Sequence, residues 1–365
     1  MSSINIKSHQ KGLTLIELMI ALVLGLLLVA GTIQVFVSNK QTARVTEAHS
    51  RIQENARFAL EILSRDIRAA GYSGCRTIDN MNIQTVANAP VPASMSPTTI
   101  VTGSNDESGT LTPTPSFSAS LGTVVPGTDL ITIQRGSGCG ANLVGNVGSS
   151  NANIKVYSPN TCNIQDDDVL MVADCEDAHV FRAKKISNPS GGSNQQTIAH
   201  AASNNQTTHF CKSYSDPIST GACGTGEAKN YGYDSELFRY SSFTYYIRNN
   251  PAGNPALYRY DETRSTSGQN PIELVEGIEN LQIEYGADDN ANNTVDRYVT
   301  AKTINDASDW DKVVSARISI LAQTLETNLT TSDQKVNYNG AELTGTDGRI
   351  RRVFTSTIAI RNRVQ

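Results

Sequence analysis

The stretch KGLTLIELMIALVLGLLLVAGTIQVFV, residues 11–37, decides the fold of this 365-residue chain. It follows a short basic leader, and Glu17 is the one formal charge between Leu13 and Val37. An α-helix of this length spans roughly 37 Å, which is enough to cross the hydrocarbon core of a bilayer. The sequence therefore predicts a leader over residues 1–12 and a membrane-spanning helix over residues 13–37.

The leader has the charge of a cytoplasmic segment. It contains Lys7 and Lys11 and no acid, which favours a cytoplasmic N-terminus by the positive-inside tendency. A secretory signal would have a shorter apolar core followed by a small-residue cleavage site, whereas here Gly12 precedes the apolar run. Cleavage after Gly12 would remove the leader and leave the whole hydrophobic helix on the mature protein.

Helical periodicity continues beyond the membrane segment, over residues 38–70. One apolar stripe steps by three or four positions through Val45, Ala48, Ile52, Ala56, Ala59, Leu63, Ile67 and Ala70. The polar side predicts two i,i+4 ion pairs, Glu47 with Arg51 and Glu61 with Arg65. Gly71 is a residue at which the helix is expected to end. We therefore predict one helix from about Leu13 to Ala70, whose amphipathic second half packs on a head.

The sequence predicts that the head, residues 71–365, is rich in β-strands and loops. Residues 71–128 predict loops with short strands, and Pro271–Ile278 a turn or a single helical turn. A turn-rich link between two of the predicted strands, residues 243–248 and 257–260, indicates a hairpin. The predicted strands are Leu130–Gln134, Val169–Ala173, Val180–Ile186, Phe243–Arg248, Leu257–Tyr260, Leu281–Tyr285, Val313–Leu321 and Val353–Ile360.

Six cysteines follow the apolar run: Cys75, Cys139, Cys162, Cys175, Cys211 and Cys223. An even number on one side of a membrane anchor predicts disulfides in an oxidising compartment. Six cysteines allow fifteen pairings. We expect the local bridges Cys162–Cys175 and Cys211–Cys223, which leaves Cys75 to join Cys139 and tie the end of the helix to the head.

The segment K-G-L-T-L-I-E, running into an apolar helix, resembles the class III leader of type IV pilins and pseudopilins. The resemblance implies that a prepilin peptidase cuts between Gly12 and Leu13 and that the new amine of Leu13 is N-methylated. It also implies that Glu17 pairs with the N-terminal amine of a neighbouring subunit. Two features depart from the pattern: Leu13 stands where most members have Phe, and the first proline of the chain is Pro90.

Four further segments resemble the PilW family of minor type IV pilins, which shares its organisation with the J-type pseudopilins of type II secretion. They are Phe58–Cys75, Leu274–Gly286, Trp310–Thr324 and Arg351–Arg363. The resemblance implies an α+β, type IV pilin-like fold: a long N-terminal α-helix stalk packed on a β-rich, loop-rich globular head that disulfides stabilise. Residues 81–125 and 187–225 carry almost no family signal.

The resemblance implies a minor pilin that helps to prime assembly and sits at or near the tip of a type IV pilus, which serves twitching motility, adhesion or DNA uptake. The implied partners are other minor pilins, the major pilin, the prepilin peptidase and the inner-membrane assembly platform. The chain would cross the inner membrane once, with its head in the periplasm, before it enters the pilus. Two alternatives stay open: a J-type minor pseudopilin of a type II secretion system, and a tip adhesin or DNA-binding module.

Enzyme signatures are absent from the sequence. It contains no G-x-S-x-G, no H-E-x-x-H and no phosphate-binding glycine loop, and its five histidines are scattered. Lys and Arg number 30 against 35 Asp and Glu, and no basic tract indicates nucleic acid directly. We expect a protein without catalytic activity.

Residues 287–298, ADDNANNTVDRY, give the one candidate metal site. Asp288, Asn290, Asn292, Thr294 and Asp296 fall at positions one, three, five, seven and nine of an EF-hand-type Ca²⁺ loop. Position twelve is Val299 where a bidentate Glu belongs. Asn and Asp also form such turns without a metal, and an Asx-rich turn is the favoured interpretation. The run of acids at residues 166–168 reads as a solvated turn.

Overall fold

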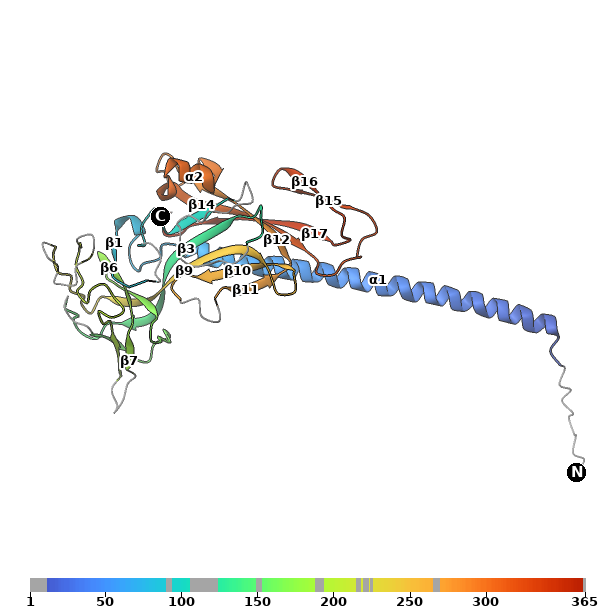
Figure 1. The fold of residues 1–365 in the computed structure, drawn as a ribbon, viewed down its shortest axis with the longest axis horizontal. Helices are drawn as coiled ribbons and strands as arrows, with labels where there is room; N and C mark the ends of the chain where they lie inside the picture. The colour runs from blue at the N-terminus through green and yellow to red at the C-terminus, as the bar shows by residue number, and fades with distance from the viewer. Residues whose placement is uncertain are drawn as a thin grey trace, which may run out of the picture.

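The computed structural model describes residues 12–89, 94–105, 124–148, 153–187, 194–214, 218, 223, 226–264 and 270–363. One long helix, α1 (Leu15–Arg68), projects from a β-rich head that packs along its second half (Figure 1). The predicted α+β layout, a long apolar N-terminal helix followed by a β-rich head with disulfides, is therefore confirmed.

Helix α1 is 54 residues long. It begins after Thr14, whose hydroxyl accepts a hydrogen bond from the Glu17 N–H, and ends at Ala69, two residues before Gly71 at φ 72°. The predicted stripe faces the head: Val45 is partly buried, and the other seven residues, Ala48 to Ala70, are buried. The amphipathic pattern thus identified the packing face of the helix.

An eight-stranded sheet forms one layer of the head. Its path is β1-β6-β5-β9-β10-β11, with β3 paired to β9 and β2 to β3. Strand β1 pairs in parallel with β6, and the other pairs are antiparallel. The strands are β1 (Asn82–Thr85), β2 (Val101–Ser104), β3 (Leu130–Asn142), β5 (Val169–Ala173), β6 (Asp177–Arg182), β9 (Glu236–Asn249), β10 (Pro255–Asp261) and β11 (Ile272–Glu276).

A second, four-stranded antiparallel sheet has the order β13-β12-β14-β17. Its strands are β12 (Ile278–Ala287), β13 (Arg297–Thr300), β14 (Val313–Gln323) and β17 (Arg351–Ala359). The smaller elements are η1 (Ile78–Asn80), α2 (Ala301–Ala307), η2 (Trp310–Lys312), the hairpin β15 (Gln334–Tyr338) with β16 (Ala341–Gly345), and a three-stranded sheet of β4 (Asn153–Tyr157), β8 (Gln195–Ala199) and β7 (Lys185–Ser187).

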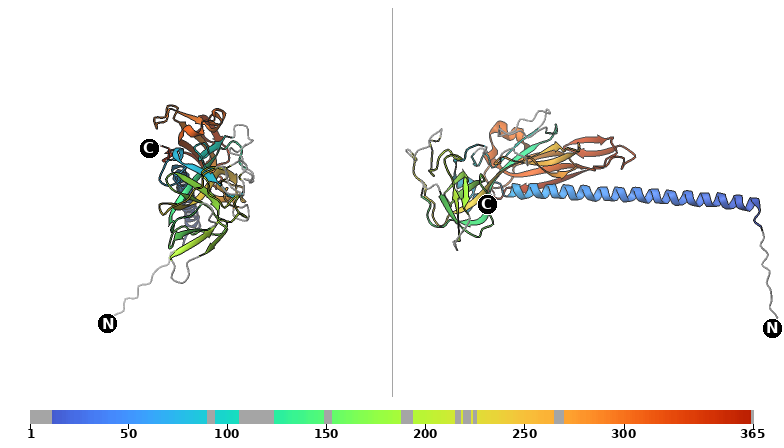
Figure 2. Two further views of the ribbon diagram at one scale, coloured as in Figure 1. Left: turned by 90° about the vertical axis from the view of Figure 1, so that its left-hand side faces the viewer. Right: turned by 60° about the horizontal axis from the view of Figure 1, so that its bottom comes forward.

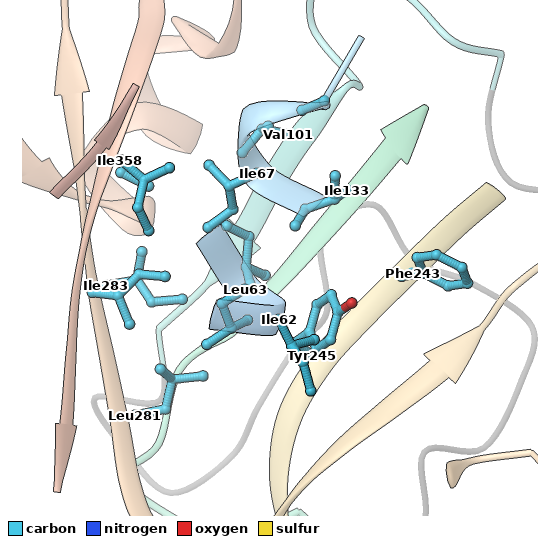
Figure 3. Packing of buried hydrophobic residues seen from close by; sticks show 14 of the residues in the cluster. Ile62, Leu63, Ile67, Val101, Ile133, Phe243, Tyr245, Leu281, Ile283 and Ile358 are labelled. Atoms are coloured by element: carbon cyan, nitrogen blue, oxygen red, sulfur yellow. The ribbon is translucent and has the colours of Figure 1, made fainter. Parts of the chain in front are cut away.

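The main core lies where α1 passes between the two larger sheets. Figure 3 shows Ile62, Leu63 and Ile67 of α1 with side chains of both sheets around them. The eight-stranded sheet contributes Val101, Ile133, Phe243 and Tyr245, and the four-stranded sheet contributes Leu281, Ile283 and Ile358. A second cluster, which includes Phe181, Phe210 and Tyr231, fills the lobe beyond the end of α1 that is seen in Figure 2.

Each predicted strand overlaps an observed one. Two predictions differ from the structure, one for a strand and one for a turn. The predicted strand Val180–Ile186 is divided: β6 ends at Arg182, and β7 begins at Lys185 in another sheet, because Lys184 N–H donates to the Ala199 carbonyl. The turn or single helical turn predicted for Pro271–Ile278 is wrong, since Ile272–Glu276 form β11, which pairs with β10. The predicted hairpin of β9 and β10 is confirmed.

The disulfides join Cys75 to Cys175, Cys139 to Cys162 and Cys211 to Cys223. Cys211–Cys223 is the expected local pair, but the expected bridges Cys162–Cys175 and Cys75–Cys139 are wrong. The physical reason is the parallel pairing of β1 with β6, which brings the chain that leaves α1 alongside Asp177 and so next to Cys175. Cys162 reaches Cys139 because the backbone and side chain of Thr161 both donate to the Cys139 carbonyl.

Candidate assembly surface of the N-terminal helix

The first half of α1 presents apolar side chains on every side. The large apolar residues from Leu13 to Val37 are between 54% (Val29) and 79% (Leu15) exposed. The helix is long and apolar enough to cross a membrane. The second half is covered by the head on one face, and the two halves form one continuous helix (Figure 1). Exposure of such a large apolar surface to water is energetically unfavourable. This half of α1 therefore requires lipid or other helices around it.

The N-terminus of α1 has the residues of a capping box and its N-cap bond, and the Glu17 carboxylate bonds to the Thr14 hydroxyl. Thr14 Oγ1 accepts from the Glu17 N–H at 3.3 Å and donates to Glu17 Oε2 at 3.4 Å. A Thr at the N-cap and a Glu three residues later reciprocally stabilise a helix start, and a carboxylate there complements the helix dipole. The spacing T-x-x-E was visible in the sequence, and sequence reasoning missed it. Glu17 therefore has a local role at the helix end besides any role between subunits.

A buried carboxylate fixes the far end of α1 to the head. Asp66 is fully buried; its carboxylate accepts from the Tyr245 hydroxyl on β9, and from Arg135 Nη2 on β3 at 3.2 Å. Arg65 Nε donates to the same carboxylate at 3.2 Å. Sequence reasoning missed Asp66 because it counted only apolar residues on the packing stripe. The acid directly before Ile67 was the feature of the sequence that could have indicated this buried contact.

The C-terminal segment of the chain closes over the end of α1. The Arg361 N–H donates to the Arg68 carbonyl at 3.4 Å, and Asn362 Nδ2 donates to the Ala70 carbonyl at 2.8 Å. Arg363 is buried and donates to the carbonyls of Pro97, Trp310 and Asp311. The bonds to Arg68 and Ala70 satisfy carbonyls that the end of α1 leaves without partners. The bonds of Arg363 connect the same segment to the head.

The two predicted ion pairs on α1 have different outcomes. Arg51 and Glu47 form the expected pair at 2.6 Å. The pair of Glu61 with Arg65 is wrong, because Arg65 contacts Asp66 instead. Both arginine side chains are more than 60% exposed, so neither contact contributes much to stability.

The loop predicted as a possible Ca²⁺ site is a network of Asx turns. Asp288 accepts from the backbone N–H groups of Asn290, Asn292 and Asn293, and Asp296 accepts from the Asp289 N–H. The Asn292 side chain accepts from the Thr294 N–H at 2.8 Å. The described residues include no group of three or more His, Cys, Asp or Glu arranged to hold a metal. The Ca²⁺ site stays a prediction.

Residues 166–168 form the solvated turn expected from their charge. Asp168 contacts Arg239 at 3.2 Å and accepts from the Gln165 N–H. Asp166 accepts from the Ile186 N–H, which connects this turn to β7. Each of these two carboxylates therefore has a structural partner in the protein.

Two of the scattered histidines meet in the second core cluster. His179 is buried with Nδ1 2.5 Å from the Tyr231 hydroxyl oxygen, and His200 stacks on Phe210 at 4.7 Å. Burial lowers the pKa of both His179 and His200 to about 4, so both are neutral at pH 7. Their rings pack against aromatic side chains, which makes them core residues.

Comparison with known families agrees with this arrangement. Residues 244–362 match the model of the PilW family, described as Type IV Pilus-assembly protein W. Residues 7–33 match the prokaryotic N-terminal methylation motif. No curated protein and no solved structure matches the chain.

The exposed apolar helix, its methylation motif and the β-rich head define a type IV pilin-like protein. The PilW match, over residues 244–362, supports a minor pilin within that class. The matched residues include the four-stranded sheet and strands β10 and β11, which lie along the second half of α1 (Figure 1). The comparisons thus point to a structural component of a pilus.

Proposed function

We propose that this minor pilin is anchored by residues 13–37 in the inner membrane, with its head in the periplasm, and then enters a type IV pilus near its tip. The exposed apolar half of α1 carries the proposal. In lipid this surface is solvated by acyl chains, and in a filament the same surface packs against the helices of neighbouring subunits. The transfer exchanges one apolar environment for another, so apolar burial alone does not oppose it.

The Gly12–Leu13 cleavage junction and the Glu17 carboxylate have separate roles in this proposal. A prepilin peptidase cuts between Gly12 and Leu13, and the new N-terminal amine of Leu13 is methylated. Glu17 then pairs with the N-terminal amine of a neighbouring subunit. An unpaired carboxylate in an apolar helix bundle is strongly unfavourable, so only an arrangement that supplies the amine is stable. Glu17 therefore sets the register of the helices.

The size of the head supports a position near the tip, together with other minor pilins. Beyond α1 the head contains two larger sheets, a hairpin and a three-stranded sheet. Its second lobe extends past the end of α1 (Figures 1 and 2). A head of this size is difficult to repeat along the side of a filament, whereas the tip offers space. We infer that the chain helps to prime assembly from that position.

Pilus counts on a deletion strain test the priming role. The expected result is a strain with few or no pili that the full-length gene restores. Immunogold labelling of the head is expected at filament ends. Labelling along whole filaments would contradict the tip position, and loss of secreted proteins with normal pili would favour a pseudopilus.

A further inference from the structure

A groove lies beside the second half of α1, on the side that the head leaves open. It has a volume of about 910 Å³, and its walls are α1 from Arg57 to Ala69, Tyr72 and the C-terminal residues Arg361 and Asn362. The segment at residues 361–362 is held there by the bonds to the carbonyls of Arg68 and Ala70 described above. The groove is therefore built from two segments of the chain, residues 57–72 and residues 361–362, that are distant in sequence.

The groove is basic. Four arginines line it, Arg57, Arg65, Arg68 and Arg361, against one lining carboxylate, Glu61. In the described part of the chain, no carboxylate lies within ion-pair distance of Arg57, Arg68 or Arg361, and Arg65 shares its only one, Asp66, with Arg135. The whole chain carries a formal charge of −5, so this local excess of cations differs from the rest of the molecule.

The groove also has apolar walls. Phe58 is 52% exposed and borders the groove together with the partly buried Leu60 and Tyr72. An exposed phenylalanine that lines a groove together with several arginines is typical of a protein interface, in which aromatic residues and Arg are enriched. Guanidinium forks bind carboxylates in bidentate geometry.

We propose that this groove receives an acidic, amphipathic segment of another pilin subunit, whose carboxylates bind Arg57, Arg68 and Arg361 and whose apolar side chain covers Phe58. The proposal rests on the proposed function, because it assigns a partner to the second half of the assembly helix. It places a polar, specific contact on the same helix that presents the apolar assembly surface.

Other anionic partners fit the groove less well. Arg57 lies twenty residues beyond Val37, or about 30 Å along the helix, which is beyond the reach of lipid head groups at the membrane. The phosphate backbone of a nucleic-acid duplex carries no apolar group and would leave the apolar walls of the groove unused. Carboxylates beside an apolar side chain satisfy both the charge and the walls of the groove.

Crosslinking in cells tests the proposal on the full-length chain. We place p-benzoylphenylalanine at Phe58, irradiate, and identify crosslinked peptides by mass spectrometry. The expected product is a second chain that carries an N-terminal methylation motif, joined at a segment rich in Asp or Glu. The same probe at Tyr233, which is 68% exposed in the far lobe, serves as the control and is not expected to give this product.

Charge reversal tests the role of the arginines. The double variant Arg57→Glu/Arg361→Glu is expected to lower the yield of the crosslink about tenfold or more. Arg352→Glu, a single charge reversal of the same kind at an exposed position of β17 outside the groove, is expected to leave the crosslink yield unchanged. Formation of the disulfide Cys75–Cys175 in each variant reports that the head has folded.

The outcomes separate this proposal from the proposed function. If the chain is present in sheared filaments but Phe58 gives no crosslink to a pilin, or the double variant crosslinks normally, the groove proposal is wrong and the assembly role stands. A crosslink to nucleic acid, or to a segment without acidic residues, also contradicts it. If the chain is absent from filaments in every variant, the assembly role itself is wrong.

Discussion

The hydroxyl of Tyr245 donates a hydrogen bond to the fully buried carboxylate of Asp66, and this contact connects the end of the stalk helix to the central strand β9. Burial, together with the neighbouring Asp66 carboxylate, raises the pKa of Tyr245 far above its usual value, so its hydroxyl stays a donor at every physiological pH. Arg135 supplies the positive charge that a buried carboxylate requires. The stalk therefore leaves the head in one fixed direction.

Removal of that donor should weaken the whole head. Tyr245→Phe leaves one oxygen of Asp66 without its partner, and we expect a loss of about 1–3 kcal/mol in the free energy of unfolding. The measurement is denaturant unfolding of the full chain in detergent. Tyr157→Phe, at a 44% exposed tyrosine, is the matched control and should have no effect. Equal stability of Tyr245→Phe and the parent would show that the contact contributes nothing.

The three disulfides should contribute unequally to the free energy of unfolding. Cys75–Cys175 closes a segment of 100 residues and Cys211–Cys223 one of 12. In the chain-entropy model the longer loop is worth about 2 kcal/mol more. We therefore expect Cys75→Ser/Cys175→Ser to lower the free energy of unfolding more than Cys211→Ser/Cys223→Ser. Thermal unfolding of both double variants gives the order, and the reverse order would contradict the expectation.

The buried histidines predict a loss of stability in acid. Burial lowers the pKa of His179 and His200 to about 4, while the unfolded chain has an ordinary pKa near 6.5. As the pH falls from about 6.5 to about 4, the unfolded state takes up protons that the folded state does not, so stability falls. Each histidine accounts for about 3 kcal/mol over this range.

His200→Phe provides the test, because the ring of His200 stacks on Phe210 and its Nδ1 has no hydrogen-bond partner in the described structure. The variant loses only the bond between Nε2 and the Thr208 carbonyl, at 3.3 Å. Near pH 8 the variant should be less stable than the parent only by the lost bond to Thr208. Between about pH 6.5 and about pH 4 its free energy of unfolding should fall about half as much as that of the parent. Burial raises the pKa of Glu262, which acts in the opposite direction in both proteins, so their difference isolates His200. An unchanged pH profile would contradict the assignment.

The Asn- and Asp-rich loop at residues 287–298 should hold its shape without a metal. Because Asp288 accepts from three backbone N–H groups, we expect no heat from millimolar Ca²⁺ in calorimetry on the full chain. Saturable heat that Asp288→Ala abolishes would instead establish the Ca²⁺ site.

Periodic features of this fold were predictable, and contacts between distant segments were not. The stripe from Val45 to Ala70 identified the packed face of α1, since helix period and burial are directly coupled. The pairing of Cys75 with Cys175 depended on the parallel approach of β1 to β6, which no local pattern indicates. Strand β11 was missed because its edge position leaves Ile272 and Glu273 exposed and weakens the alternation.

The same contrast applies to the candidate assembly surface. The apolar run and its acid, Glu17, could be read directly, whereas the buried acid Asp66 became visible only with its partners on β3 and β9. The groove bounded by Arg57 and Arg361 likewise became visible only when the structure placed these two distant segments together.

The central claim is that Glu17 acts between subunits and does more than cap its own helix. Glu17→Gln keeps a polar side chain that can serve in the capping box and removes the charge. Thr14→Ala removes the N-cap side chain and keeps the charge, at a loss of about 1 kcal/mol in helix stability. The two variants therefore separate the local role from the proposed one.

The most direct measurement is the amount of each full-length variant in sheared filaments relative to the membrane fraction. The account predicts that Glu17→Gln remains in the membrane at parental level but is reduced about tenfold or more in filaments, because no charge is left to pair with a neighbouring amine. Thr14→Ala should be incorporated almost normally. Normal incorporation of Glu17→Gln, with Thr14→Ala as the defective variant, would contradict the account.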